Sequence, residues 1–138
     1  MKDWRKALIG PEATFRDALK AIDATGAGMA LIVDDDRRLI GVLSDGDFRR
    51  ALIRGAGLED LAVSAANREP LCIDQHQDRA ATLAMLRAHS LRQLPVLDSG
   101  RRVVGLTTVS DFLNIPVRSN PVVIMAGGKG KRLAELTR

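Results

Sequence analysis

Residues 41–47 read Gly41-Val42-Leu43-Ser44-Asp45-Gly46-Asp47, and residues 105–111 read Gly105-Leu106-Thr107-Thr108-Val109-Ser110-Asp111. Both stretches consist of a glycine, two residues, a serine or threonine, two more residues and an aspartate. A shift of 64 residues, from Gly41 to Gly105, aligns residues 17–48 with residues 81–112 without a gap. The identical pairs in this register are Leu19 and Leu83, Ala24 and Ala88, Asp34 and Asp98, Arg37 and Arg101, Arg38 and Arg102, Gly41 and Gly105, Asp47 and Asp111, and Phe48 and Phe112. The chain therefore contains an internal repeat, which we expect to define its fold.

Each copy of the repeat predicts a helix, two strands and a second helix. Thr14 and Asp17 form a capping-box pattern ahead of the first helix, and Asp78 takes the cap position in the second copy. After each helix, two apolar runs separated by a polar turn predict a β-hairpin. The expected strands are residues 29–33 and 39–43 in the first copy and 94–97 and 103–107 in the second, and residues 71–73 add a short strand ahead of the second copy.

We therefore expect an α/β fold of the mixed α+β kind, with two α-β-β-α repeats packed about a pseudo-two-fold axis. A unit of this size has an apolar face that it cannot cover alone, so the two copies should pack on each other and form two equivalent clefts. The expected divisions are residues 1–60 for the first repeat with an N-terminal extension, 61–114 for the second repeat, and 115–138 for a linker and the start of another domain.

The composition is that of an ordinary globular protein. The 138 residues are 46% hydrophobic and 28% charged, and no apolar run approaches the roughly 18 residues that a membrane span needs. The charged N-terminus lacks the apolar segment of a secretory signal, so we expect a cytoplasmic protein with no membrane partner. The basic residues behind the net charge of +4 are scattered and aromatic residues are only 3%, so we expect no nucleic-acid partner.

The sequence offers little for metal or redox chemistry. Cys72 is the single cysteine and lies in an apolar run, which favours a buried and unreactive thiol. His76 and His89 have no cysteine or acidic partner at a ligand spacing. We therefore predict no metal site.

The repeated motif allows two interpretations. A Ser or Thr followed three residues later by an Asp is a common capping box at the start of a helix. The same geometry can bind a ligand, because the free amides of a helix start and the cap hydroxyl can hold a phosphate, while the Asp can accept hydrogen bonds from ribose hydroxyls. An Asp bonded back to the cap amide would be less free to bind ribose. The placement of both copies after a glycine-containing strand, at the same offset, favours the binding interpretation.

With two α-β-β-α units that each carry this motif, residues 8–114 resemble a pair of cystathionine β-synthase (CBS) domains. The resemblance implies a regulatory module that binds an adenosine nucleotide, such as AMP, ADP or ATP, in the clefts between its repeats. It implies that Asp47 and Asp111 contact ribose, and that Ser44 and Thr108 lie near phosphate.

The resemblance also implies a phosphate contact for Arg92, because the stretch from Leu91 to Val96 is similar to the start of a strand in many family members. The first repeat has Gly28 at the position of Arg92, so the two clefts should be unequal. The stretch from Ser44 to Arg50 further resembles the motif in CBS pairs that are attached to sugar-phosphate isomerases and nucleotidyltransferases.

The C-terminal segment predicts the start of a different domain. An apolar strand at residues 121–126 leads into Gly127-Gly128-Lys129-Gly130-Lys131-Arg132, where glycines let backbone amides approach a phosphate chain. The segment resembles the N-terminal signature of sugar-1-phosphate nucleotidyltransferases, which implies that Gly127, Gly128, Gly130 and Arg132 belong to the loop that holds the nucleoside triphosphate. Residues 121–138 are too few to form that domain. We therefore expect no catalytic residues and no activity in this chain, and a need for Mg²⁺ only in the full-length enzyme.

Two functions follow as expectations. The first is a regulatory CBS pair that binds an adenosine nucleotide, forms a homodimer through its helices and modulates an attached sugar-1-phosphate nucleotidyltransferase. The second is a ligand-free dimerisation scaffold for the same enzyme.

Overall fold

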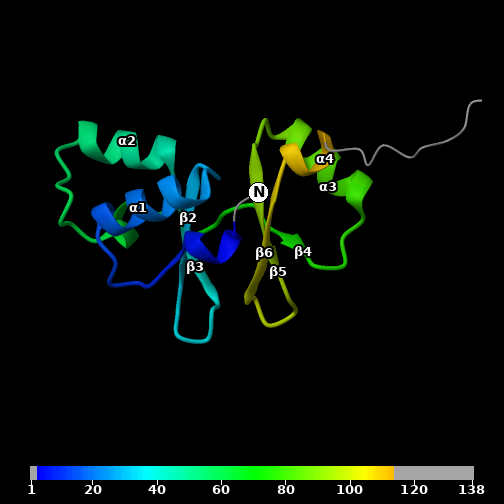
Figure 1. Ribbon diagram of the computed structural model, residues 1–138, viewed down its shortest axis with the longest axis horizontal. Coiled ribbons are helices and arrows are strands. Elements are labelled where there is room, and N and C mark those ends of the chain that lie inside the picture. The colour runs from blue at the N-terminus through cyan, green and yellow to red at the C-terminus, as the bar shows by residue number, and fades with distance from the viewer. Residues whose placement is uncertain (1–2, 114–138) are drawn as a thin grey trace, which may run out of the picture.

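The computed structural model describes residues 3–113. Each repeat begins with a short strand and continues with a helix, a hairpin and a second helix (Figure 1). The first repeat contains β1 (Leu8–Ile9), α1 (Phe15–Thr25), β2 (Met29–Val33), β3 (Leu39–Ser44) and α2 (Asp45–Ile53). The second contains β4 (Ile73–Asp74), α3 (Arg79–Ala88), β5 (Gln93–Leu97), β6 (Val103–Thr108) and α4 (Ser110–Leu113). Two 3-10 helices, η1 (Trp4–Ala7) and η2 (Ala62–Ala65), lie ahead of β1 and between the repeats.

The start of α1 shows why the sequence forms a helix here. The Thr14 hydroxyl accepts a hydrogen bond from the Asp17 amide at 3.3 Å, and the Asp17 carboxylate accepts one from the Thr14 amide at 3.0 Å. This reciprocal pair is the predicted capping box, which is confirmed. At the other end, Gly26 has a φ of 64°, a left-handed conformation that glycine adopts at low cost and that ends the helix.

Each repeat forms its own three-stranded sheet, with the orders β1-β2-β3 and β4-β5-β6. The hairpin pairs β2 with β3 and β5 with β6 in antiparallel fashion, as predicted. The short first strands run parallel to the hairpins, with Leu8 opposite Leu31 and Ile73 opposite Val96. The sequence indicated only the second of these strands, at residues 71–73 rather than 73–74. A two-residue strand is too short to show an alternating pattern, which is why β1 was missed.

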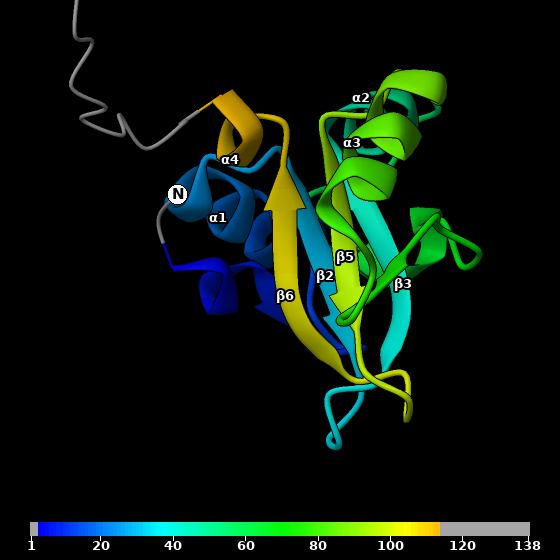
Figure 2. The ribbon, with the colours of Figure 1, turned by 90° about the vertical axis from the view of Figure 1, so that its right-hand side faces the viewer.

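The two sheets face each other in the middle of the molecule, with the helices on the outer sides (Figure 1). Figure 2 shows β5 and β6 in front of β2 and β3. Leu31 and Val42 of the first sheet share one buried cluster with Val103 and Leu106 of the second. Burial of such side chains stabilises a fold by about 1.5–3 kcal/mol each. The central core therefore belongs to both repeats at once.

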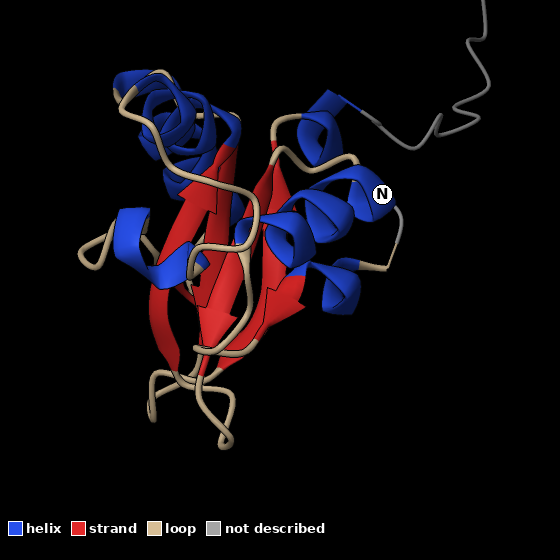
Figure 3. Ribbon diagram, turned by 90° about the vertical axis from the view of Figure 1, so that its left-hand side faces the viewer, coloured by secondary structure: helices blue, strands red, loops and turns tan. Residues whose placement is uncertain are grey.

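The hairpin turns meet at one end of the sheets and show the symmetry directly (Figure 3). The Leu39 amide donates to the Arg101 carbonyl at 3.1 Å, and the Val103 amide donates to the Arg37 carbonyl at 2.9 Å. The two hydrogen bonds exchange under the shift of 64 residues. The predicted packing of the repeats about a pseudo-two-fold axis is therefore confirmed.

Within residues 3–113, every helix is too short or too polar to span a lipid bilayer.

Candidate functional site

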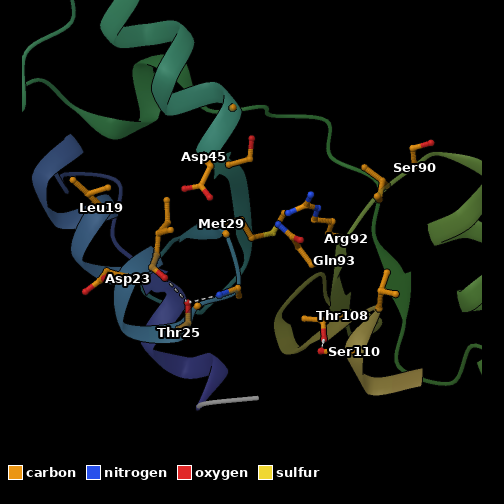
Figure 4. A pocket seen from close by; sticks show the side chains of 18 of the residues that line it. Leu19, Asp23, Thr25, Met29, Asp45, Ser90, Arg92, Gln93, Thr108 and Ser110 are labelled. Carbon is orange, nitrogen blue, oxygen red and sulfur yellow. Dashed lines mark hydrogen bonds between the residues drawn. The ribbon is translucent and has the colours of Figure 1, made fainter. Parts of the chain in front are cut away.

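A cleft of about 1120 Å³ opens at the end of the sheets opposite the hairpin turns. Its walls include the first residues of β2 and β5, Met29 and Gln93, and the last residues of β3 and β6, Ser44 and Thr108. The C-terminal part of α1 forms one further side (Figure 4). The volume slightly exceeds the roughly 300–1,000 Å³ of pockets that hold small molecules.

The cleft lies across the pseudo-two-fold axis. Residues that line it come in pairs separated by 64 positions: Gly26 and Ser90, Ala27 and Leu91, Gly28 and Arg92, Met29 and Gln93, Ser44 and Thr108, Asp45 and Val109, and Gly46 and Ser110. The two separate clefts expected from the repeat are therefore joined in one continuous hollow. The reason is that both strand starts and both helix starts point to the same end of the facing sheets.

Ser44 lines the cleft and caps α2. The Ser44 hydroxyl donates to Asp47 Oδ2 at 2.7 Å and accepts from the Asp47 amide at 3.2 Å, while the Ser44 amide donates to Asp47 Oδ2 at 3.0 Å. Arg50 donates to the other carboxylate oxygen, Oδ1, at 2.6 Å. The capping-box interpretation of this motif is therefore realised in the first repeat.

The surroundings of Asp47 change its acidity. Partial burial acts most strongly and raises the pKa of the carboxyl group, but the hydrogen bonds from Ser44 and Arg50 together outweigh it and hold the pKa below the usual 3.8. The side chain is 21% exposed and does not line the cleft. Asp47 thus stabilises the start of α2 from beside the cleft.

The second copy of the motif differs in detail. The Thr108 amide donates to Asp111 Oδ2 at 2.7 Å, as its counterpart does in the first repeat. The Thr108 hydroxyl, however, lies 2.6 Å from the Ser110 hydroxyl, and both residues line the cleft. Asp111 does not line it. Of the predicted ligand residues, Ser44, Arg92 and Thr108 are thus brought together, while Asp47 and Asp111 stand behind them.

Arg92 lies at the edge of the second repeat's half of the cleft. Its carbonyl accepts a hydrogen bond from the Val109 amide at 2.9 Å, just as the Gly28 carbonyl accepts one from the Asp45 amide at 3.1 Å. Arg92 and Gly28 therefore occupy equivalent backbone positions. Arg92 and Gln93 extend from the start of β5 across the cleft (Figure 4). The guanidinium is present on one side only, so the two halves are unequal in charge.

Asp45 and Gln93 line the cleft but were not among the predicted ligand residues. A Cβ on Gly28 would lie 3.5 Å from Asp45 Oδ2 and 3.4 Å from Gln93 Nε2, so both side chains flank this glycine. The carboxylate of Asp45 projects into the cleft from the first residue of α2 (Figure 4). The repeat alignment could have indicated Asp45, because the equivalent position in the second repeat is the apolar Val109. Gln93 carried no such signal.

The remaining predictions concern a metal site, the Cys72 thiol and the C-terminal segment. Among residues 3–113, no three His, Cys, Asp or Glu side chains gather as a metal site would require. Cys72 is half-buried rather than buried; burial raises the pKa of its thiol, against a smaller opposite effect of the Arg101 charge. The predicted triphosphate loop, with Gly127, Gly128, Gly130 and Arg132, lies outside the described residues.

The fold and the cleft together define a class of protein: a tandem repeat of two small α+β units with a shared hollow between them. The chain belongs to the CBS domain family, whose model matches residues 5–54 and 59–118.

Proteins of related sequence align with most of this chain. An uncharacterized protein of Helicobacter pylori is 32% identical over 113 residues, which are 81% of this chain and 34% of that protein. An arabinose 5-phosphate isomerase of Pseudomonas aeruginosa is 28% identical over 117 residues, again 81% of this chain and 34% of the isomerase. The chain thus spans about a third of the length of the curated relatives it matches.

Among solved structures, a CBS domain protein from Pyrobaculum aerophilum complexed with AMP has a TM-score of 0.70 at 22% identity, with 79% of this chain and 84% of that chain covered. This likeness confirms the fold of the tandem CBS pair.

Proposed function

We propose that this CBS pair is a regulatory module that binds an adenosine nucleotide in the shared cleft. The observation that carries the proposal is the convergence of Arg92, Ser44 and Thr108 on one hollow of about 1120 Å³ between the repeats. A guanidinium and two helix starts are groups that recognise phosphate. Two solved CBS structures of similar fold, the Pyrobaculum protein and CBSX2, are complexes with AMP, which agrees with this assignment.

In the proposed complex, phosphate lies near Arg92 and the cap residues, and Asp47 and Asp111 serve the ribose. Both carboxylate oxygens of Asp47 already accept hydrogen bonds, and release of Arg50 would free Oδ1 to accept one from ribose. The Arg50 side chain is 59% exposed, and an exposed pair of this kind contributes only about 0–1 kcal/mol. Replacing Arg50 by a ribose hydroxyl as the partner of Asp47 therefore costs little free energy.

Isothermal titration calorimetry with AMP, ADP, ATP and S-adenosylmethionine tests the proposal. We expect at least one of these ligands to bind, and Arg92→Ala to weaken binding by about tenfold or more, because a charge-assisted hydrogen bond contributes about 1.5–3 kcal/mol. Arg68→Ala is the matched control, since Arg68 is exposed and does not line the cleft. Absence of heat with all four ligands, or equal affinity of wild type and an Asp47→Ala, Asp111→Ala double variant, would contradict the proposed site.

We also propose that the pair modulates an attached sugar-1-phosphate nucleotidyltransferase. This enzyme would require Mg²⁺ and would act in the cytoplasm. The support is the sequence Gly127-Gly128-Lys129-Gly130-Lys131-Arg132. Relatives of the CBS region include arabinose 5-phosphate isomerases, so a sugar-phosphate isomerase is the second candidate for the attached enzyme. Release of pyrophosphate from a nucleoside triphosphate and a sugar 1-phosphate by the full-length protein distinguishes transfer from isomerisation.

A ligand-free dimerisation scaffold is the alternative role. The end of α2 favours it, because Leu52 is 41% exposed and Ile53 is 79% exposed there. Both roles are compatible with a homodimer, so sedimentation does not separate them. A ligand that prefers the folded state must raise the melting temperature, whereas a ligand-free scaffold shows no such shift with any adenosine nucleotide.

A further inference from the structure

The ionisable side chains that line the cleft are divided between the repeats by sign. Among the described residues they are Asp23 and Asp45 from the first repeat and Arg92 from the second. In Figure 4, Asp45 and Asp23 lie on the side of α1 and α2, and Arg92 reaches in from the opposite side. The net charge of these three groups is negative by one. A cleft that serves a highly charged polyphosphate would be expected to carry the opposite balance.

In the first repeat, Asp45 lies in the cleft at the helix start that would have to receive a phosphate. It is the first residue of α2, and its carboxylate already provides the negative charge that the helix start favours. The neighbouring Ser44 hydroxyl is engaged with Asp47 at 2.7 Å. A phosphate at this helix start would therefore meet like-charge repulsion and an occupied hydroxyl.

The equivalent place in the second repeat also has an engaged hydroxyl, since the Thr108 hydroxyl lies 2.6 Å from that of Ser110, but its charge is different. Val109 stands where the first repeat has Asp45, and Arg92 stands where it has Gly28, as the matching hydrogen bonds from Val109 and Asp45 show. This half therefore has a cation and no acid among its lining residues. The anionic group of a ligand has one suitable place, beside Arg92 and Thr108.

We propose that Asp45 makes the cleft selective for an adenosine ligand with a single phosphate and disfavours di- and triphosphates. This inference rests on the proposed nucleotide function. Each added phosphate brings about one more negative charge, which Asp23 and Asp45 repel and which Arg92 alone among the ionisable lining residues attracts. The expected order of affinity is AMP, then ADP, then ATP.

Calorimetry on the wild type and on Asp45→Asn tests the selectivity, with and without Mg²⁺. We expect AMP to bind at least about tenfold more tightly than ATP in the wild type, and Asp45→Asn to strengthen ATP binding about five- to tenfold while AMP changes less than about threefold, because the removed repulsion grows with ligand charge. The gap between AMP and ATP should narrow at high salt. Asp35→Asn is the matched control, because this exposed acid lies in the hairpin turn away from the cleft.

Asp45→Val provides a second variant, since it copies the residue of the other repeat, and melting curves verify that each variant is folded. Equal or tighter binding of ATP than AMP by the wild type, under either Mg²⁺ condition, would overturn the selectivity but leave nucleotide binding intact. Equal changes in AMP and ATP affinity on Asp45→Asn would likewise overturn the selectivity and leave nucleotide binding intact. A wild type that binds neither ligand would overturn both this inference and the proposed function.

Discussion

Asp45 and Asp47 are two residues apart in one motif but face different surroundings. The Asp47 carboxylate accepts hydrogen bonds from Ser44 and Arg50 and lies beside the cleft. The Asp45 carboxylate projects into the cleft and accepts no hydrogen bond from the described residues that would fix it there. The motif spacing pointed to Asp47 as the ligand residue. At this scale, the direction in which each side chain leaves the helix start decides which carboxylate lines the cleft.

The Asp47 carboxylate in the capping box of α2 predicts a dependence of stability on pH. Because its folded pKa lies below the usual 3.8, the carboxylate stabilises the fold at pH values above about 4, and this contribution is lost as the pH falls through the folded pKa. We expect Asp47→Asn to lower the free energy of unfolding by about 0.5–1 kcal/mol at pH 7, because the capping box loses the negative charge of its N3 carboxylate near the helix start. Urea denaturation at pH 7 and pH 3 measures the effect.

The difference between Asp47→Asn and the wild type should shrink as the pH falls below the usual pKa of 3.8, because the stabilisation by the ionised carboxylate is then progressively lost. Asp36→Asn serves as the control, because Asp36 is an exposed acid in a turn, and its variant should match the wild type at both pH values. A difference for Asp47→Asn that persists unchanged at pH 3 would contradict a role for the ionised cap.

At the scale of the element, the two glycines of the repeated motif differ although the sequence treats them alike. β3 pairs on its outer edge with the connector: the Val42 amide donates to the Asn67 carbonyl at 2.9 Å, and the Asn67 amide returns a hydrogen bond at 2.8 Å. A Cβ on Gly41 would lie only 2.9 Å from the Asn67 carbonyl oxygen. A Cβ on Gly105 would meet Val96 Cβ at 3.4 Å instead.

We therefore expect Gly41→Ala to lower the free energy of unfolding by about 1–3 kcal/mol, because the backbone of the connector must move. Gly105→Ala is the matched comparison and should change it by less than about 1 kcal/mol, since its neighbour is a side chain at near-normal distance and alanine restricts the unfolded chain. Chemical denaturation of both variants measures the difference. Equal losses would show that the connector does not constrain β3.

At the scale of the whole molecule, the repeats depend on each other for their core. Leu31 and Val42 are covered by Val103 and Leu106 of the other repeat. If residues 1–66 are made alone, we expect no cooperative thermal transition in the monomer, because this apolar face would be open to water. Circular dichroism at several concentrations, with sedimentation to define the monomer, measures this. A monomeric fragment with a sharp transition would show that the first repeat is stable without its partner.

Much of this fold is predictable from the sequence because the decisive signals are local. Thr14 with Asp17, and Ser44 with Asp47, identify helix starts within four residues of chain. The apolar runs on either side of a polar turn identify β2, β3, β5 and β6 to within one residue. The strand β1 was out of reach, since its two residues are ordered only by pairing with β2.

The sequence by itself determined the duplication, the order of helices and hairpins, and the unequal pair of Gly28 and Arg92, because a shift of 64 residues compares these positions directly. Only the tertiary structure decided that the two expected clefts are one, that Asp45 rather than Asp47 projects into it, and that Gly41 touches the connector. These properties depend on contacts between segments far apart in the chain. Such contacts exist only after the sheets have packed on each other, and no local pattern of residues specifies them.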